Sequence, residues 1–132
     1  MNNLKLNHDL VRYTMLSIES SKNITGPLED ELLANLSNYG EYDRNQIAYT
    51  VMKLKEAKYI TGDVQWGNNQ PVIISPGNLT YEGHKFLDNI RDDGVWKDTK
   101  NILSKFSSVS LTLVSNVAAG VITQIIKHQM GI

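Results

Sequence analysis

The stretch from residue 43 to residue 75 constrains the fold most, because the spacing of its apolar residues changes once, from a helical to an extended period. Its first half, DRNQIAYTVMKLKEAKYI, repeats apolar residues about once per helical turn. Asp43 and Gln46 have the spacing of a capping box, which predicts a helix that begins just after Asp43. The apolar stripe of this helix is formed by Ile47, Val51, Leu54 and Ala57.

The second half of that stretch predicts a β-hairpin. Residues 59–65 and 71–75 are the expected strands, and the sequence Gly67-Asn68-Asn69 between them tolerates the left-handed backbone of a tight turn. The expected hairpin tip, or wing, carries Trp66, Asn68 and Asn69. Trp66 either folds back onto the core or stays exposed as an anchor for a partner protein, since tryptophan is enriched at interface hot spots.

Helical signals lie on both sides of this stretch. Asn7 is placed to cap a first helix, and Pro27 suits the first turn of a second helix that closes at residues 38–40. Thr80 is placed to cap a fourth helix. The expected core residues of the first and fourth helices are Leu10, Val11, Met15, Ile18, Phe86, Leu87 and Ile90.

This order of elements predicts a mainly α fold with a small β-hairpin, in the α+β class. The order helix, helix, helix, hairpin, helix is typical of a winged helix-turn-helix domain, which is expected at residues 1–93 with its closing helix. Residues 94–132 are expected to form a C-terminal helical extension that acts as an oligomerisation element. A three-helix bundle without a wing is the structural alternative.

A cluster of charged residues, in LTYEGHKFLDNIRDDGVW at residues 79–96, falls between two expected helices. Gly94 is expected to stop the fourth helix, Asp92 or Asp93 to cap the next one, and Arg91 to pair with either carboxylate. The histidines are far apart in sequence, and neither a nucleophile elbow nor a glycine-rich phosphate loop is present. The chain is therefore expected not to be an enzyme, to bind no metal and to need no cofactor.

The amino-acid composition and net charge limit which kinds of partner the chain is expected to bind. The 132 residues carry 13 Lys and Arg against 14 Asp and Glu, and the net charge of −1 weighs against nucleic-acid binding without excluding a local basic face. The chain has no cysteine, which excludes disulfides and thiolate metal sites. No apolar segment follows the first five residues, so a secretory signal is not expected. The expected location is therefore the cytoplasm.

The third helix and the wing are compatible with two functions, DNA binding and protein binding. In a DNA-binding winged helix the third helix enters the major groove, where Arg, Asn and Gln can read base edges and Lys can neutralise phosphates. The candidate DNA-binding residues are Arg44, Asn45, Gln46, Tyr49, Thr50, Lys53 and Lys55. The wing carries no Lys or Arg, which favours the alternative of a protein-interaction module; no small-molecule substrate is evident.

The C-terminal stretch FSSVSLTLVSNVAAGVITQII, residues 106–126, contains no charged residue. Three interpretations remain open: a helix packed on its own domain, a dimerisation helix and a membrane tail, the last disfavoured by its many polar residues. A three-four repeat marks the candidate oligomerisation seam at Leu111, Val114, Ala118, Val121 and Ile125. A homodimer is the expected assembly.

The motifs at residues 45–60 and 79–96 together resemble an uncharacterised family of bacterial and phage proteins, catalogued as domain of unknown function twenty-five thirteen. The resemblance runs from about Leu6 to the C-terminus. It implies a winged-helix fold and a frequent origin in phages or prophages of Gram-positive bacteria, and it brings no known activity and no catalytic residues. With this resemblance, the sequence predicts a small phage or prophage transcriptional regulator, or alternatively a phage-encoded adaptor or modulator of a host factor.

Overall fold

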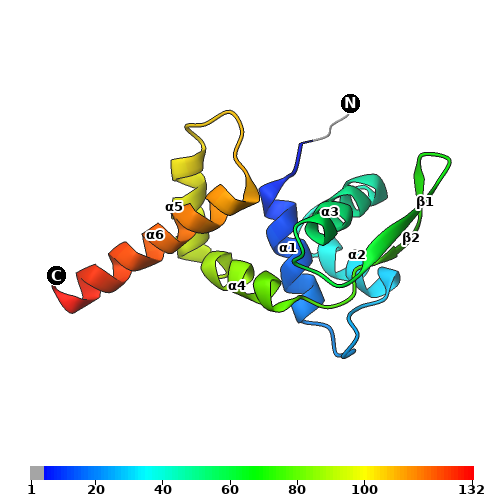
Figure 1. Cartoon of the computed structure of the whole chain (residues 1–132), viewed down its shortest axis with the longest axis horizontal. Helices are drawn as coiled ribbons and strands as arrows, with labels where there is room; N and C mark the ends of the chain where they lie inside the picture. Colours follow the sequence, from blue (N-terminus) through cyan, green and yellow to red (C-terminus); the bar gives the residue numbers. More distant parts are fainter. Residues whose placement is uncertain (1–4) are drawn as a thin grey trace. The chain divides into compact units, whose positions relative to one another are not determined.

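The computed structural model of the chain describes residues 5–132. Within these residues it is mostly helical with one two-stranded antiparallel sheet, which confirms the predicted α+β class (Figure 1). The elements are α1 His8–Glu19, α2 Glu29–Ser37, α3 Arg44–Glu56, β1 Asp63–Gly67, β2 Gln70–Ser75, α4 Tyr81–Ile90, α5 Asp93–Leu103 and α6 Leu111–Met130.

Two compact units make up the chain, and the division falls within α4. The first contains the described residues up to His84, and the second contains Lys85–Ile132. The predicted domains met at residues 93 and 94, so all of α4 was expected to close the first one. Residues 1–4 of that predicted domain lie outside the described residues.

The helices of the first unit begin at the predicted capping residues, with one exception. The Asn7 side chain accepts a hydrogen bond from the Leu10 amide of α1, and Asp43 and Gln46 form the complete capping box of α3. The exception is α2, which begins two residues later than expected. Leu28 is its N-cap, and Pro27 therefore precedes the helix and is buried.

The core of the first unit forms where α1 packs against α2 and α3. The predicted stripe of α1 is buried, as are Ile47, Val51 and Leu54 of α3. Ala57 was predicted to complete the stripe of α3 but is instead the C-cap, while Ala48 is fully buried. The backbone of Lys58 is left-handed (φ 67°), which ends the helix and turns the chain toward the hairpin.

The hairpin is shorter than predicted at its start. Asn68 and Asn69 both have a left-handed backbone, with φ of 53° and 63°, and form the predicted tight turn. Residues 59–62 were predicted to begin the first strand, but they run beside residues 76–79 in isolated contacts rather than in the ladder. Gly62 permits this approach, because a Cβ atom there would lie 1.8 Å from the Ser75 carbonyl oxygen.

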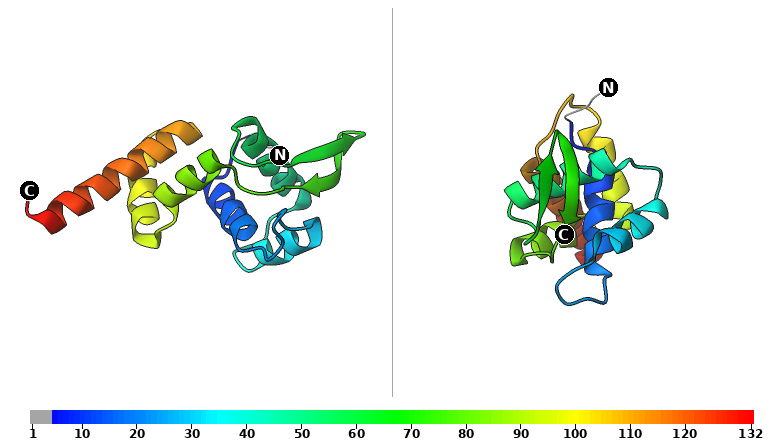
Figure 2. Two further views of the ribbon diagram at one scale, coloured as in Figure 1. Left: turned by 60° about the horizontal axis from the view of Figure 1, so that its bottom comes forward. Right: turned by 90° about the vertical axis from the view of Figure 1, so that its right-hand side faces the viewer.

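A β-bulge between Gln65 and Trp66 shifts the register of the two strands. Val64 faces Ile74 on the buried side of the ladder, while the bulge leaves Val72 without a partner across the ladder. Figures 1 and 2 show the two strands extending side by side beyond the helices of the first unit. The hairpin is thus fixed at its base and exposed toward its tip.

In the second unit, Asp92 caps α5 by accepting a hydrogen bond from the Val95 amide. Gly94 was predicted to stop α4, but α4 already ends at Ile90 and Gly94 lies in the first turn of α5. Ser110 caps α6, and Gly131 ends it with a left-handed backbone. Helix α6 packs against α5 and buries Val114 and Ala118.

Replacing Ser17 with Ala is expected to raise the free energy of unfolding by about 1–2 kcal/mol. The Ser17 hydroxyl is buried in α1 and has no hydrogen-bond partner among residues 5–132, and such a group carries an uncompensated desolvation cost. Urea unfolding of both proteins measures the change. The control is Ser37→Ala on an exposed helical surface, expected within about 0.5 kcal/mol of wild type. A destabilised S17A protein would contradict the argument.

Candidate functional site

Arg44, the first residue of α3, joins three elements of the first unit. Its Nε atom lies 2.6 Å from Glu29 Oε2, and its Nη2 atom donates to Glu29 Oε1 at 3.2 Å. The same guanidinium donates to the carbonyl oxygens of Pro71 and Val72, at 2.5 and 3.0 Å. Arg44 therefore connects the start of α2, the start of α3 and the outer edge of β2.

Glu29 completes this arrangement from the other side. Its Oε1 atom accepts a hydrogen bond from the Ile74 amide at 3.0 Å, so carboxylate and guanidinium together satisfy neighbouring backbone groups of β2. The hydrogen bond from Arg44 lowers the pKa of Glu29 below its ordinary value of 4.5; partial desolvation opposes this shift, and the Ile74 amide and the Arg44 charge reinforce it. The carboxylate thus stays ionised where it holds the strand.

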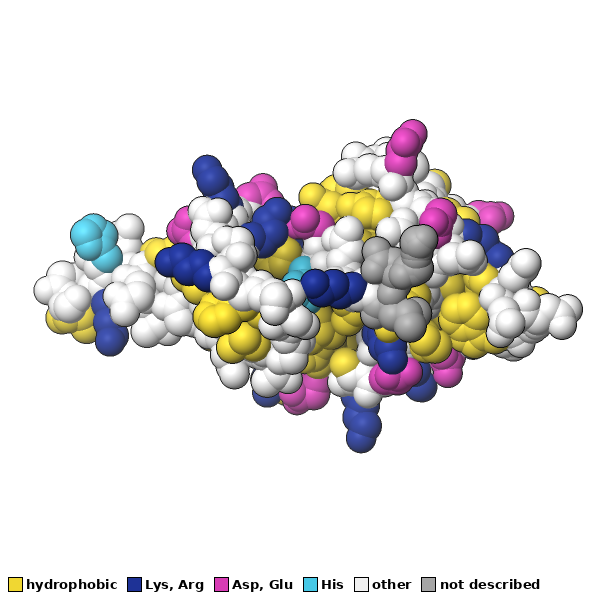
Figure 3. Space-filling view, turned by 90° about the horizontal axis from the view of Figure 1, so that it is seen from above, with side chains coloured by type: hydrophobic (Ala, Val, Ile, Leu, Met, Phe, Trp, Pro, Cys, Tyr) yellow, Lys and Arg dark blue, Asp and Glu magenta, His cyan; other side chains and the backbone are white. Residues whose placement is uncertain are grey.

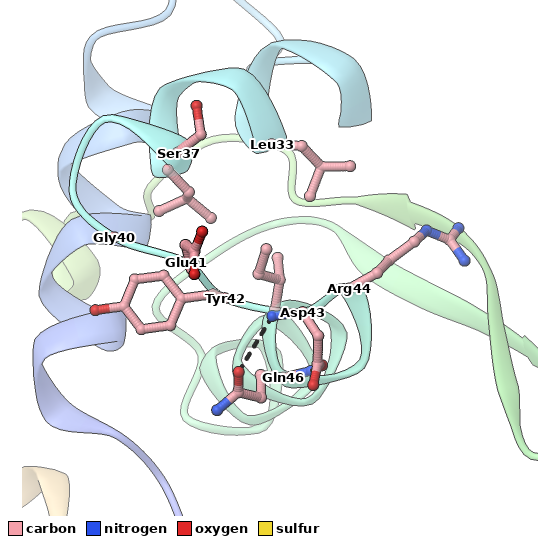
Figure 4. A pocket seen from close by; sticks show the side chains of 10 residues that line it. Leu33, Ser37, Gly40, Glu41, Tyr42, Asp43, Arg44 and Gln46 are labelled. Carbon is pink, nitrogen blue, oxygen red and sulfur yellow. Dashed lines mark hydrogen bonds between the residues drawn. The ribbon is translucent and has the colours of Figure 1, made fainter.

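Two of the predicted DNA-binding residues make contacts within the chain. All the guanidinium contacts given above are internal, while 39% of the Arg44 side chain is exposed, so base reading by Arg44 stays a prediction. Thr50 was expected to contact a phosphate, but it is buried and its hydroxyl donates to the Gln46 carbonyl oxygen at 2.8 Å. The Gln46 side chain accepts from the Asp43 amide at 3.2 Å in the capping box (Figure 4).

The other predicted DNA-binding residues do lie at the surface of α3. Asn45 and Lys55 are exposed, and Tyr49 is half-buried. Lys53 forms an ion pair of 3.0 Å with Glu56 and lies 5.4 Å from the centre of the Tyr49 ring. Together with the exposed carboxylate of Glu56, these residues form a polar face of mixed charge on α3 and not a continuous basic surface.

The hairpin carries an apolar surface that we call the wing surface: Trp66, Val72 and Ile73. Their exposures are 44%, 56% and 45%, and residues 64–75 include no charged side chain. Trp66 is therefore exposed, as one of the two sequence-based alternatives had it. Sequence periodicity did not identify Val72 and Ile73, because strict alternation would bury one of the two and the bulge at Gln65 exposes both.

A groove of about 750 Å³ lies between α2 and the start of α3. We call it the α2–α3 groove; it is lined by Leu33, Leu36, Ser37, Gly40, Glu41, Tyr42, Asp43, Arg44, Gln46 and Ile47. In Figure 4, Leu33 points toward this space from α2, and Arg44 extends away from it toward the hairpin. Burial raises the pKa of Tyr42 above its ordinary value, and the neighbouring Tyr13 adds to the shift.

The residues of the predicted oligomerisation seam differ in their exposure to solvent. Val114 and Ala118 are buried, Leu111 and Val121 are half-buried, and Ile125 is exposed. Within residues 5–132, no helix is both long and apolar enough to span a bilayer. In the same part of the chain, no group of three or more His, Asp or Glu side chains is placed to hold a metal ion.

Comparison with known proteins places the chain in a family. The family described as "Hypothetical protein (DUF2513)" matches residues 5–110. The chain belongs to this family. The resemblance seen in the sequence was expected to run to the C-terminus. The family match ends earlier, at Ser110, which is the N-cap of α6.

The chain is also similar to an uncharacterized protein of Haemophilus influenzae. The two are 29% identical over 124 residues, which cover 93% of this chain and 99% of the relative. No solved structure matches. Neither the family description nor the name of the relative states an activity.

Replacing Glu29 with Gln is expected to weaken the acid sensitivity of the fold. Because the pKa of Glu29 is lowered in the folded protein, its ionised form stabilises the fold at neutral pH, and this contribution is lost as pH falls through the lowered pKa. Urea unfolding at neutral pH and below pH 4.5 should show a smaller fall in unfolding free energy for E29Q than for wild type.

The control for E29Q is Asp30→Asn, which neutralises the exposed neighbouring carboxylate. It should leave the pH dependence close to that of wild type. Equal acid sensitivity in wild type and E29Q would show that the ion pair does not stabilise the fold.

Proposed function

We propose that the chain is a winged-helix protein-interaction module that uses its wing surface to bind a partner protein. The order of elements and the exposed hairpin after α3 support the winged-helix assignment. The observation that carries the function is the wing surface itself: Trp66, Val72 and Ile73 are each exposed on a hairpin that carries no charged side chain between residues 64 and 75.

The chemistry of the wing suits a protein better than a nucleic acid. Phosphate binding needs Lys or Arg, and residues 64–75 have none. Interface cores, by contrast, are depleted in charge and enriched in aromatic residues, with tryptophan prominent among hot spots. A phage-encoded adaptor or host-factor modulator would need a surface of this kind.

The internal use of Arg44 supports the same proposal. It is the only arginine of α3, the helix that enters the major groove in DNA-binding relatives of the fold. The first turn of α2, which would lie beside the DNA backbone, carries Glu29, Asp30 and Glu31. Both features remove positive charge from the face that DNA would approach.

Trp66→Ala and Ile73→Ser are each expected to weaken partner binding more than tenfold, because hot-spot truncation typically costs about 2 kcal/mol or more. Immobilised full-length protein is used to capture partners from lysate of the source organism. A captured protein is then purified and titrated by calorimetry against wild type and both variants. Unfolding curves verify that the variants remain folded.

The matched control is Ser75→Ala, which truncates an exposed polar side chain at the base of the same hairpin. The proposal requires a protein that binds wild type and S75A alike and binds W66A and I73S more weakly. A partner that ignores both substitutions, or the absence of any partner together with selective DNA binding, would refute it.

DNA binding by a transcriptional regulator is the second candidate function, favoured by the exposed polar face of α3. Asn45, Tyr49, Lys53 and Lys55 remain able to reach a ligand there. If this candidate holds, Lys53→Ala with Lys55→Ala should weaken binding to fragments of the source genome and reduce its salt dependence by about two phosphate contacts. Fluorescence anisotropy across a salt series measures both effects. Under the interaction-module proposal, wild type shows no saturable, sequence-selective binding even at low salt.

A further inference from the structure

A row of apolar residues on α6, which winds around the helix by about 40° at each step of four residues, is covered along only part of its length. Val114, Ala118, Ile122, Ile126 and Met130 follow one another at four-residue spacing. The first two are buried where α6 packs against α5, Ile122 is half-buried, and Ile126 and Met130 are 50% and 66% exposed. Every residue from 123 to 132 is exposed. We call residues 122–132 the α6 tail.

The α6 tail also carries a cation that is free to bind. Among residues 5–132 the Lys127 side chain has no hydrogen-bond or ion-pair partner, and His128 lies beside it in the last turn. In Figure 3 the α6 end of the chain is mostly uncoloured, with a small hydrophobic area, a Lys or Arg side chain and a histidine. A helix of this kind, apolar on one stripe and basic next to it, fits a groove with an apolar floor and an acidic rim.

The α2–α3 groove has that composition. Leu33, Leu36 and Ile47 supply apolar lining, and Glu41 and Asp43 supply two carboxylates. Arg44 adds no net positive charge there, since Glu29 is paired with it. Among the described residues, the Glu41 side chain has no hydrogen-bond or ion-pair partner. An uncompensated carboxylate on the groove therefore matches an uncompensated ammonium group on the tail.

We propose that the α6 tail of a second copy of this chain inserts into the α2–α3 groove. Ile126 and Met130 then contact the apolar lining, and Lys127 pairs with Glu41. The groove volume of about 750 Å³ lies within the range of sites that enclose side chains of a ligand. Reciprocal insertion covers both tails and closes the assembly as a dimer.

This inference concerns a different surface from the wing surface and does not rest on the proposed partner protein. It also assigns separate tasks to the predicted oligomerisation residues. Val114 and Ala118 hold α6 on α5 of the same chain, and Ile125 with its neighbours extends toward the second copy.

The test is the oligomeric state of the full-length protein, measured by sedimentation equilibrium over a concentration series. Wild type is expected to be a dimer. Ile126→Asp in the tail, and Leu33→Asp or Glu41→Lys in the groove, should each raise the dimer dissociation constant about tenfold or more. Circular dichroism verifies that each variant folds.

A charge exchange identifies the pair directly. Lys127→Glu alone should weaken the dimer, and combining it with Glu41→Lys should restore most of the affinity, since the ion pair is re-formed with reversed signs. Two controls, Asp30→Lys on α2 and Ile102→Asp on α5, alter exposed residues outside both surfaces and should leave the dimer intact.

Three results would overturn the proposal. Wild type could be monomeric throughout the series. The tail variant could abolish the dimer while both groove variants leave it intact, which would assign the contact to pairing of two α6 helices instead. Finally, E41K and K127E could weaken the dimer independently, with no recovery in the double variant.

Discussion

The first unit depends on the paired side chains of Glu29 and Arg44. A two-stranded hairpin is marginally stable by itself, and its edges present backbone groups that need partners. Here the carboxylate accepts from the Ile74 amide and the guanidinium donates to the Val72 carbonyl oxygen, so a charged pair completes the edge of β2. Because both side chains are partly exposed, solvent screens their charge–charge attraction, and the hydrogen bonds of the pair contribute more than the charges do. What the pair provides is geometry: it fixes the hairpin against the N-termini of α2 and α3.

That geometry determines which surfaces are left for function. Holding β2 uses the one arginine of α3, so the helix keeps only a mixed polar face. The same contacts run along the outer edge of β2 from Ile74 to Pro71 and leave the side chains of Trp66, Val72 and Ile73 exposed. A fold that commits its arginine internally and exposes apolar side chains at its tip is suited to contact a protein.

Signals between residues close in sequence predicted much of this fold. The Asn7 cap, the capping box of Asp43 and the left-handed turn at Asn68 each depend on groups three or fewer positions apart, so a short window of sequence contains the whole interaction. The contacts of Arg44 span 15 residues to Glu29 and 27 to Pro71, and no periodicity reveals such pairs. For this reason the sequence did not predict the internal contacts of Arg44. The bulge escaped prediction because it depends on how two strands align, not on either strand alone.

In the C-terminal stretch, the difference in length between α5 and α6, rather than the residue types of α6, separates the covered part of α6 from its exposed part. At about 1.5 Å per residue, the 11 residues of α5 extend about 16 Å and the 20 residues of α6 about 30 Å, so α5 can cover only about half of α6. The apolar residues of α6 continue beyond the part that α5 covers, with the same spacing and residue types. The sequence alone therefore predicts a single continuous oligomerisation seam. A helical segment of about ten residues with no tertiary contact is marginal in water. The left-handed cap at Gly131 satisfies the last carbonyl groups of α6, but it cannot cover Ile126 or Met130. A surface with these properties is stabilised when another chain covers it, so the helix that α5 leaves half-covered is itself the reason to expect a second copy.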